Sequence, residues 1–170
     1  MRIPTLSQYY WPDNVAHKSH VNLLRAVVLL AGEFRLPKLR LTPSESEFDS
    51  RLDLAGVTDG QVGDVLALDG LSRNDLLVYL VRTSELIFLS VAKMFGLLLL
   101  KAGALGGVNV VSGHEFVRDV CSPIRNFDPN SPYSNACAVA RFVQGDTAPL
   151  SDRSAPTSSW KSFCHESTCR

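Results

Sequence analysis

The chain has 170 residues, of which 45% are hydrophobic and 20% charged, and its formal net charge is zero. This length and composition are typical of one folded domain with its own core, and they exclude a wholly disordered chain. Electroneutrality also argues against a simple polyanion-binding protein, because nucleic-acid affinity depends on clustered cations.

Residues 1–12 are predicted to form an irregular aromatic arm, and an amphipathic helix follows from about residue 14 to Ala31. Three adjacent aromatic side chains in the arm cannot all face one way, so we expect at least one to pack outside its own segment. These side chains are Tyr9, Tyr10 and Trp11. The helix gathers its apolar residues on one broad arc. Pro37 then favours an extended connector over residues 35–41.

Three successive segments have helix-capping patterns, in which Ser or Thr precedes an acidic or amide residue by three positions. The first helix is predicted to start at a Thr42 cap and to end at Gly56, because glycine readily terminates a helix. A weaker helix follows from Thr58 to about Leu68. Ser72 then caps the next element.

That next element is predicted to be one long helix, Asp75–Leu105. Its charged residues fall on a narrow stripe, and apolar residues cover the rest of its circumference. A helix of this kind suits the centre of a helical bundle. The apolar part, Leu86–Leu105, leaves a membrane span open as well, although Lys93 would then lie near mid-bilayer at a cost of about 2.5–3.5 kcal/mol.

Short elements are predicted to alternate with loops in the C-terminal part. Residues 108–111 are either a short strand or an extended linker, and a short helix runs from Ser112 to about Cys121. A proline-rich ordered loop precedes the last helix, which begins at Ser134 or Asn135. Residues 146–170 are rich in Ser, Thr and Pro and are predicted to be a flexible tail.

Together these elements predict an all-α fold. Five or six helices of unequal length form an irregular bundle around the long apolar helix, in a single domain over residues 1–145. The N-terminus lacks the apolar region of a signal peptide, and four cysteines do not make a disulfide scaffold at this length. A soluble, intracellular protein is therefore expected.

No motif specifies a catalytic residue. The residue types of a cysteine-dependent hydrolase are present, but no glycine-rich elbow surrounds either candidate nucleophile. These residues are Cys121 or Cys137, His114, and Asp119 or Asp128. The sequence therefore predicts no active site, and a small cysteine hydrolase is kept only as an alternative.

Two clusters have the residue types of metal ligands. Cys164, His165 and Cys169 lie within six residues, but a structural zinc site prefers a second matched pair, which the chain lacks. His17 and His20 fall on the apolar side of the first helix and are interpreted as core-edge histidines. No metal or other cofactor is expected.

The favoured function is that of a non-catalytic structural or interaction subunit of a larger assembly, of the self-assembling coat or shell type. The apolar helix is too large for short neighbours to cover, and charge is segregated, with a net of +4 over residues 1–40 and −6 over residues 41–75. Both features favour contacts with other subunits or with copies of the same chain. The expected interaction surface comprises Tyr9, Tyr10, Trp11, Arg118, Arg125 and Arg141.

Two further partners are considered. Arginines interleaved with aromatic residues can hold a single-stranded nucleic acid, but here their density is low. A membrane-associated subunit, anchored by the helix over residues 86–105, is the main alternative to a coat protein.

Overall fold

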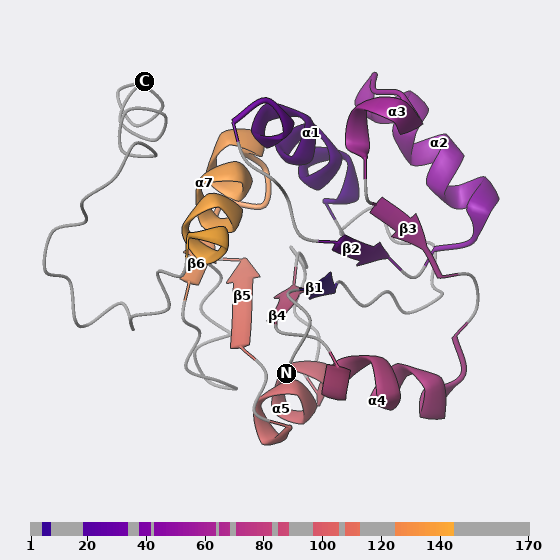
Figure 1. The fold of residues 1–170 in the computed structure, drawn as a ribbon, viewed down its shortest axis with the longest axis vertical. Coiled ribbons are helices and arrows are strands. Elements are labelled where there is room, and N and C mark those ends of the chain that lie inside the picture. Colours follow the sequence, from indigo (N-terminus) through magenta and orange to yellow (C-terminus); the bar gives the residue numbers. More distant parts are fainter. Residues whose placement is uncertain are drawn as a thin grey trace, which may run out of the picture.

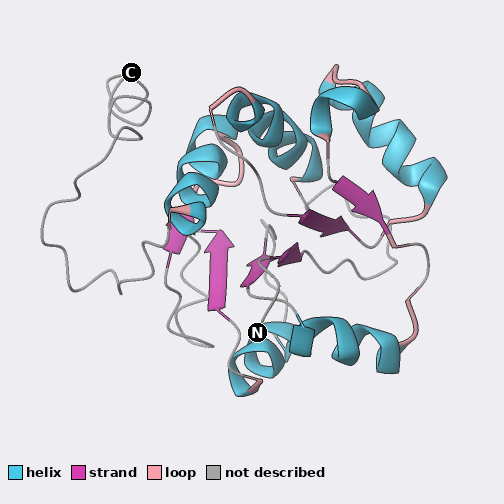
Figure 2. Ribbon diagram, in the orientation of Figure 1, coloured by secondary structure: helices cyan, strands magenta, loops and turns pink. Residues whose placement is uncertain are grey.

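In the computed structural model, six strands form one parallel sheet with helices on both faces (Figures 1 and 2). The strands are β1 (Thr5–Ser7), β2 (Lys38–Leu41), β3 (Val65–Ala67), β4 (Glu85–Phe88), β5 (Val108–Ser112) and β6 (Arg125–Phe127). The structure describes residues 5–7, 19–33, 38–41, 43–63, 65–68, 71–82, 85–88, 97–105, 108–112 and 125–144.

The strand order is β3-β2-β1-β4-β5-β6, and every neighbouring pair is parallel. The chain therefore winds outward from β1 to β3, returns to the middle of the sheet at β4, and winds outward again to β6. In the centre, Leu6 is paired with both Leu39 of β2 and Glu85 of β4. This is the strand order of a doubly wound nucleotide-binding fold, with its topological switch point between β1 and β4.

The two directions of winding place the helices on opposite faces of the sheet, because parallel crossovers are right-handed. In Figure 1, one face is covered by α1 (His20–Ala31), α2 (Glu45–Ala55), α3 (Asp59–Val62) and α7 (Pro132–Val143). The other face carries α4 (Arg73–Arg82) and α5 (Leu97–Ala104). The last helix, α7, packs against α1 and β6.

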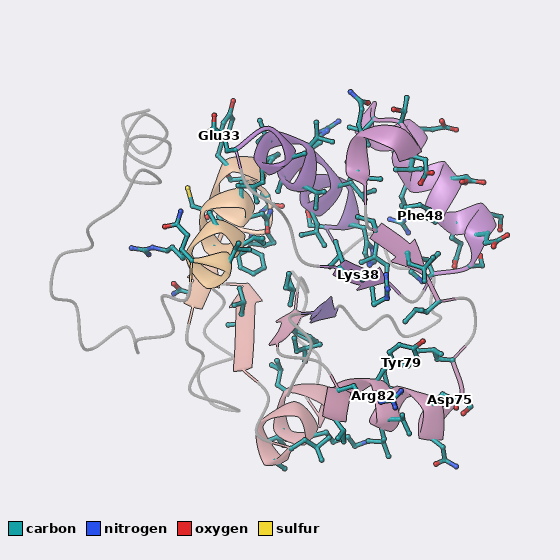
Figure 3. The ribbon with its side chains drawn as sticks, in the orientation of Figure 1. Glu33, Lys38, Phe48, Asp75, Tyr79 and Arg82 are labelled. Atoms are coloured by element: carbon teal, nitrogen blue, oxygen red, sulfur yellow. The ribbon has the colours of Figure 1, made fainter. Side chains whose placement is uncertain are left out.

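Both faces of the sheet are buried, and the alternation along each strand assigns side chains to them. Ile87 of β4 and Val110 of β5 belong to the main core with α1, α2 and α7, which includes Phe48 of α2 (Figure 3). Leu86 and Val111, their neighbours in the chain, are equally buried but lie outside that cluster. We assign them to the α5 side of the sheet, where α5 packs on β4 and β5.

The prediction of an all-α bundle was wrong. The segment predicted to be one long helix, Asp75–Leu105, contains most of α4 and all of β4 and α5. A central strand covered on both faces is an uninterrupted apolar run, and such a run has the same composition as a buried helix. The other strands lie in the predicted arm (β1), connector (β2), weak helix (β3) and proline-rich loop (β6), while β5 confirms the strand alternative for residues 108–111.

Two predicted helix ends are confirmed, the end of α2 and the start of α4, whereas α1 begins at His20 and not near residue 14. The predicted end of α2 at Gly56 is confirmed, where φ is +68°. Its N-cap is Ser44 rather than Thr42, and Ser44 and Glu47 form the capping box. The Ser72 cap of α4 is confirmed by a bond from the Asp75 backbone N–H to Ser72 Oγ (3.2 Å).

The Thr58 segment is a helix for only one turn, since α3 ends at Val62 and β3 follows. The last helix, α7, begins at Pro132, two residues before the predicted Ser134 cap. Most of the predicted helix Ser112–Cys121 and all of the predicted tail, 146–170, lie outside the described residues.

No helix in the described part of the chain is both long enough and apolar enough to cross a membrane. The apolar stretch once considered for that role, Leu86–Leu105, begins with a strand, and α5 has only 8 residues. The intracellular setting stays a prediction.

Candidate functional site at the carboxyl edge of the sheet

In a doubly wound sheet, ligands bind outside the carboxyl ends of the strands, at the switch point. Here that place is the carboxyl edge at β1 and β4, where α1 begins. Its described part is formed by the first turn of α1 and by the loop of residues 128–131 between β6 and α7. Lys38 begins β2 and Glu33 follows the end of α1, so both labelled side chains mark the opposite, amino edge (Figure 3).

The N-terminus of α1 presents backbone N–H groups at this edge. Ser19 occupies the N-cap position, yet its side chain makes no capping bond to the helix backbone. Its Oγ instead accepts a hydrogen bond from Asn22 Nδ2 (2.8 Å). The first N–H groups of a helix have no partner within the helix itself, and together with the positive end of the helix dipole they suit an anion such as a phosphate.

Asn22 joins the start of α1 to the loop before α7 at the carboxyl edge of the sheet. Its Nδ2 also donates to the carbonyl oxygen of Pro129 (2.9 Å), which lies 107 residues further along the chain. Pro129 is buried, so this carbonyl has little access to water. The bond therefore holds the β6–α7 loop against the start of α1.

The β6–α7 loop is fixed by its own hydrogen bonds. Asp128 Oδ1 accepts from the backbone N–H of Asn130 (2.9 Å), and the backbone N–H of Asp128 donates to Ser134 Oγ (2.9 Å). Ser131 caps α7 by accepting from the backbone N–H of Ser134 (3.2 Å). Asp and Ser stabilise turns in this way because their short side chains reach nearby backbone groups.

Two buried polar side chains lie just inside this edge. His20, in the first turn of α1, is 2% exposed, as expected for a core-edge histidine, whereas His17 lies outside the described residues. Asn135, in the first turns of α7, is also 2% exposed and donates its Nδ2 to the Ser131 carbonyl oxygen (2.9 Å).

The predicted interaction surface stays a prediction. Arg141 is half-buried near the end of α7, and Arg125 begins β6. The other members, Tyr9, Tyr10, Trp11 and Arg118, lie outside the described residues.

The cysteine candidates do not form an active site in the described part of the chain. Cys137 lies on α7 and is disulfide-bonded, so it is not available as a thiolate nucleophile. No group of three metal-ligating side chains occurs among the described residues. The predicted partners and metal ligands Cys121, His114, Asp119, Cys164, His165 and Cys169 lie outside them.

No protein-family model and no curated relative matches the sequence. Solved structures do match the fold. The catalytic domain of cholesterol-α-glucosyltransferase from Helicobacter pylori aligns over 83% of this chain and 87% of that one, with a TM-score of 0.62 and 16% identity. The C-terminal domain of a glycosyl transferase group 1 family protein from Francisella tularensis aligns over 85% and 77%, with a TM-score of 0.63 and 12% identity.

A longer glycosyltransferase, from Rickettsia africae, gives a TM-score of 0.67 and 12% identity over 88% of this chain. The match covers 39% of the Rickettsia protein, so the chain corresponds to less than half of it. At these identities the likeness defines the fold. It is an α/β, Rossmann-like fold, which these glycosyltransferase structures share.

These likenesses overturn the prediction of a non-catalytic coat or assembly subunit. Its argument depended on an apolar helix too large to cover, but that segment is divided between a central strand and two shorter helices. The alternative of a subunit anchored by residues 86–105 fails for the same reason. One feature of the sequence is typical of an α/β fold. Short apolar runs alternate with helical segments, as they do in βαβ units.

Proposed function

We propose that the chain is the donor-binding half of a glycosyltransferase that uses a nucleotide-activated sugar. The observation that carries this proposal is the parallel order β3-β2-β1-β4-β5-β6, with the start of α1 at the switch point. Folds of this order bind nucleotides at that point, with the phosphates at a helix N-terminus. The fold likeness to a cholesterol glucosyltransferase and to other glycosyltransferases supports a sugar nucleotide over a redox dinucleotide.

In such a transfer, the bond between the anomeric carbon of the sugar and the phosphate oxygen breaks. The electron pair leaves with the nucleoside diphosphate. The acceptor hydroxyl oxygen forms the new bond to the anomeric carbon and loses its proton to a base. The first-turn N–H groups of α1 would stabilise the negative charge that develops on the departing diphosphate, which is an electrostatic contribution to catalysis.

The chain would supply the donor side of this reaction. It matches most of a C-terminal domain of one glycosyltransferase and 39% of the length of another. The acceptor side would then belong to a second domain or a second polypeptide. Donor binding is accordingly the activity to test first.

The test is thermal unfolding of the full chain with UDP-, GDP- and ADP-glucose, each compared with its nucleoside monophosphate and with pyrophosphate. A ligand at about 100 times its Kd stabilises the folded state by about 2.7 kcal/mol. That corresponds to a rise in Tm of roughly 5–10 °C for a chain of this size. We expect one nucleotide class to produce such a shift and pyrophosphate alone to produce a much smaller one.

Asn22→Ala should weaken the response to that nucleotide sugar, because it releases the loop beside the start of α1. Asn74→Ala, the same change on the exposed surface of α4, is the matched control. If no nucleotide sugar shifts Tm while circular dichroism shows an intact fold, the proposal is wrong.

A further inference from the structure

Helix α7 contains the one cysteine among the described residues, and this cysteine is disulfide-bonded. Cys137 lies in the first half of the helix and is half-buried. The sequence has three other cysteines, Cys121, Cys164 and Cys169, so the partner within the chain is one of these. The bond therefore joins α7 to a residue that lies between 16 and 32 positions away in the sequence.

The first half of α7, next to the β6–α7 loop, packs on its neighbours α1 and β6 through small side chains. Its buried residues are Asn135, Ala136, Ala138 and Val139. An alanine removes much less apolar surface from water than a leucine does, and α1 buries three leucines along its length. Packing therefore holds this part of α7 weakly, and a covalent link adds a large share of its attachment.

The same part of α7 positions the loop of the candidate site. Residues 128–131 lead directly into the helix, and Ser131 caps it. The described side-chain bond that ties this loop to a distant part of the fold is the one from Asn22 to the Pro129 carbonyl oxygen (2.9 Å). A change in the attachment of α7 would thus be transmitted to the carboxyl edge of the sheet.

Cys137 lies on the side of α7 that does not face the main core. Tyr133 and Arg141, one turn before and one turn after it, share its stripe of the helix. Tyr133 is 48% exposed and Arg141 is half-buried. A disulfide in such a position can be reached by a small thiol in the folded protein, and a cation one turn away favours the thiolate form that carries out exchange.

We propose that the disulfide of Cys137 is a redox-sensitive restraint, which holds α7 and the β6–α7 loop in place when it is oxidised and loosens them when it is reduced. Disulfides in reducing compartments are usually transient and sense redox state, whereas permanent ones belong to oxidising compartments. The half-buried position and the small side chains under this part of α7 favour the first kind. Weaker donor binding in the reduced protein is a consequence that rests on the proposed function, whereas the restraint itself does not.

The exchange has a balanced chemistry with glutathione. A protein thiolate attacks glutathione disulfide and releases one glutathione thiolate, and the second protein thiolate then attacks the mixed disulfide and releases the other. Two protein thiols are oxidised, and one glutathione disulfide is reduced to two thiols. Reduction of the protein follows the same steps in reverse.

The experiment compares the full chain after equilibration with oxidised and with reduced glutathione. Peptide mapping of the oxidised protein should find Cys137 joined to one of the three other cysteines, and reduction should occur while circular dichroism shows an intact fold. Reduction should lower Tm by roughly 6–12 °C, because a cross-link that closes a loop of this length restricts the unfolded chain. Amide hydrogen exchange over residues 128–143 should become about fivefold faster or more, with a much smaller change in α2.

Cys137→Ser should have the Tm of the reduced wild type and should not respond to glutathione. Serine replacements of the two cysteines that mapping leaves outside the bond are the matched controls, and these variants should keep the response. The proposal is overturned if Cys137 stays a free thiol in oxidised glutathione, or if Tm does not depend on the redox state. It is also overturned if the bond can be reduced only after unfolding, or if exchange in α2 rises as much as in α7. None of these measurements needs a nucleotide, so they separate a failure of the restraint from a failure of the donor site.

Discussion

Replacement of Asn22 by alanine should destabilise the fold by about 2 kcal/mol. The side chain makes two hydrogen bonds, to Ser19 Oγ (2.8 Å) and to the Pro129 carbonyl oxygen (2.9 Å). A typical intramolecular hydrogen bond contributes about 0.5–1.5 kcal/mol, and leaving a buried acceptor unsatisfied costs about 1–3 kcal/mol. For a chain of this size, about 2 kcal/mol lowers Tm by roughly 4–8 °C.

Urea unfolding monitored by circular dichroism measures this change directly. The slope of the unfolding free energy against urea concentration should stay constant, because it reports the surface exposed on unfolding. Asn22→Asp isolates the bond to Pro129, because a carboxylate can accept a hydrogen bond from the Ser19 hydroxyl but cannot donate one to the Pro129 carbonyl oxygen, so this variant should also be destabilised. Asn74→Ala on the exposed face of α4 should change the unfolding free energy by less than about 0.5 kcal/mol. An effect of Asn22→Ala no larger than that of Asn74→Ala would refute the conclusion that this bond holds the β6–α7 loop to α1.

Three other substitutions test local features of the fold by urea or thermal unfolding. Arg25→Ala should cost about 1 kcal/mol, because Arg25 donates to the last two carbonyl oxygens of α2 (3.0 and 3.2 Å), and Arg25→Lys should recover part of this; a change under about 0.3 kcal/mol would contradict it. Gly56→Ala should destabilise by about 1 kcal/mol, because φ is +68° there, whereas Gly60→Ala within α3 should stabilise slightly. An added Cβ meets nothing within 4 Å at either glycine, so equal effects would rule out backbone conformation as the cause. Ser44→Ala should cost about 1 kcal/mol by removing the N-cap of α2, and an unchanged Tm would show that Glu47 alone is sufficient.

The sequence was informative where the determinants of structure are local. The Ser72 cap, the Gly56 terminus and the end of α1 at Ala31 depend on residues within a few positions of one another, and each was predicted at its observed place, although α1 begins at His20 and not near residue 14. These are short-range effects of hydrogen bonding and of backbone conformation, which a single sequence displays directly.

The sheet was missed because its determinants are not local. Central parallel strands are buried on both faces, so Glu85–Phe88 shows no alternation of polar and apolar residues that would distinguish it from a helix. Only the pairing with β1 and β5 makes it a strand. β1 has three residues, which is too short for any periodicity to be visible.

The candidate site could not have been found without the fold. Asn22 matters through a carbonyl group 107 residues away, and no spacing in the sequence indicates that contact. The first turn of α1 likewise becomes a candidate phosphate site only because β1 lies next to β4. A sequence motif would have been needed to predict either one, and the chain contains no such motif.

The position of β1 has a consequence for how the chain folds during synthesis. β1 precedes the other five described strands in the sequence, yet it occupies the middle of the sheet, where Leu6 is paired with Glu85 of β4. A nascent chain that has not yet reached residue 85 therefore exposes one full edge of β1, with unpaired backbone groups that can bind other extended chains. Closing a contact over about 80 residues is slow compared with forming a helix. The protein should therefore depend on chaperones more than a helical bundle of the same length, and fragments that end before β4 should aggregate.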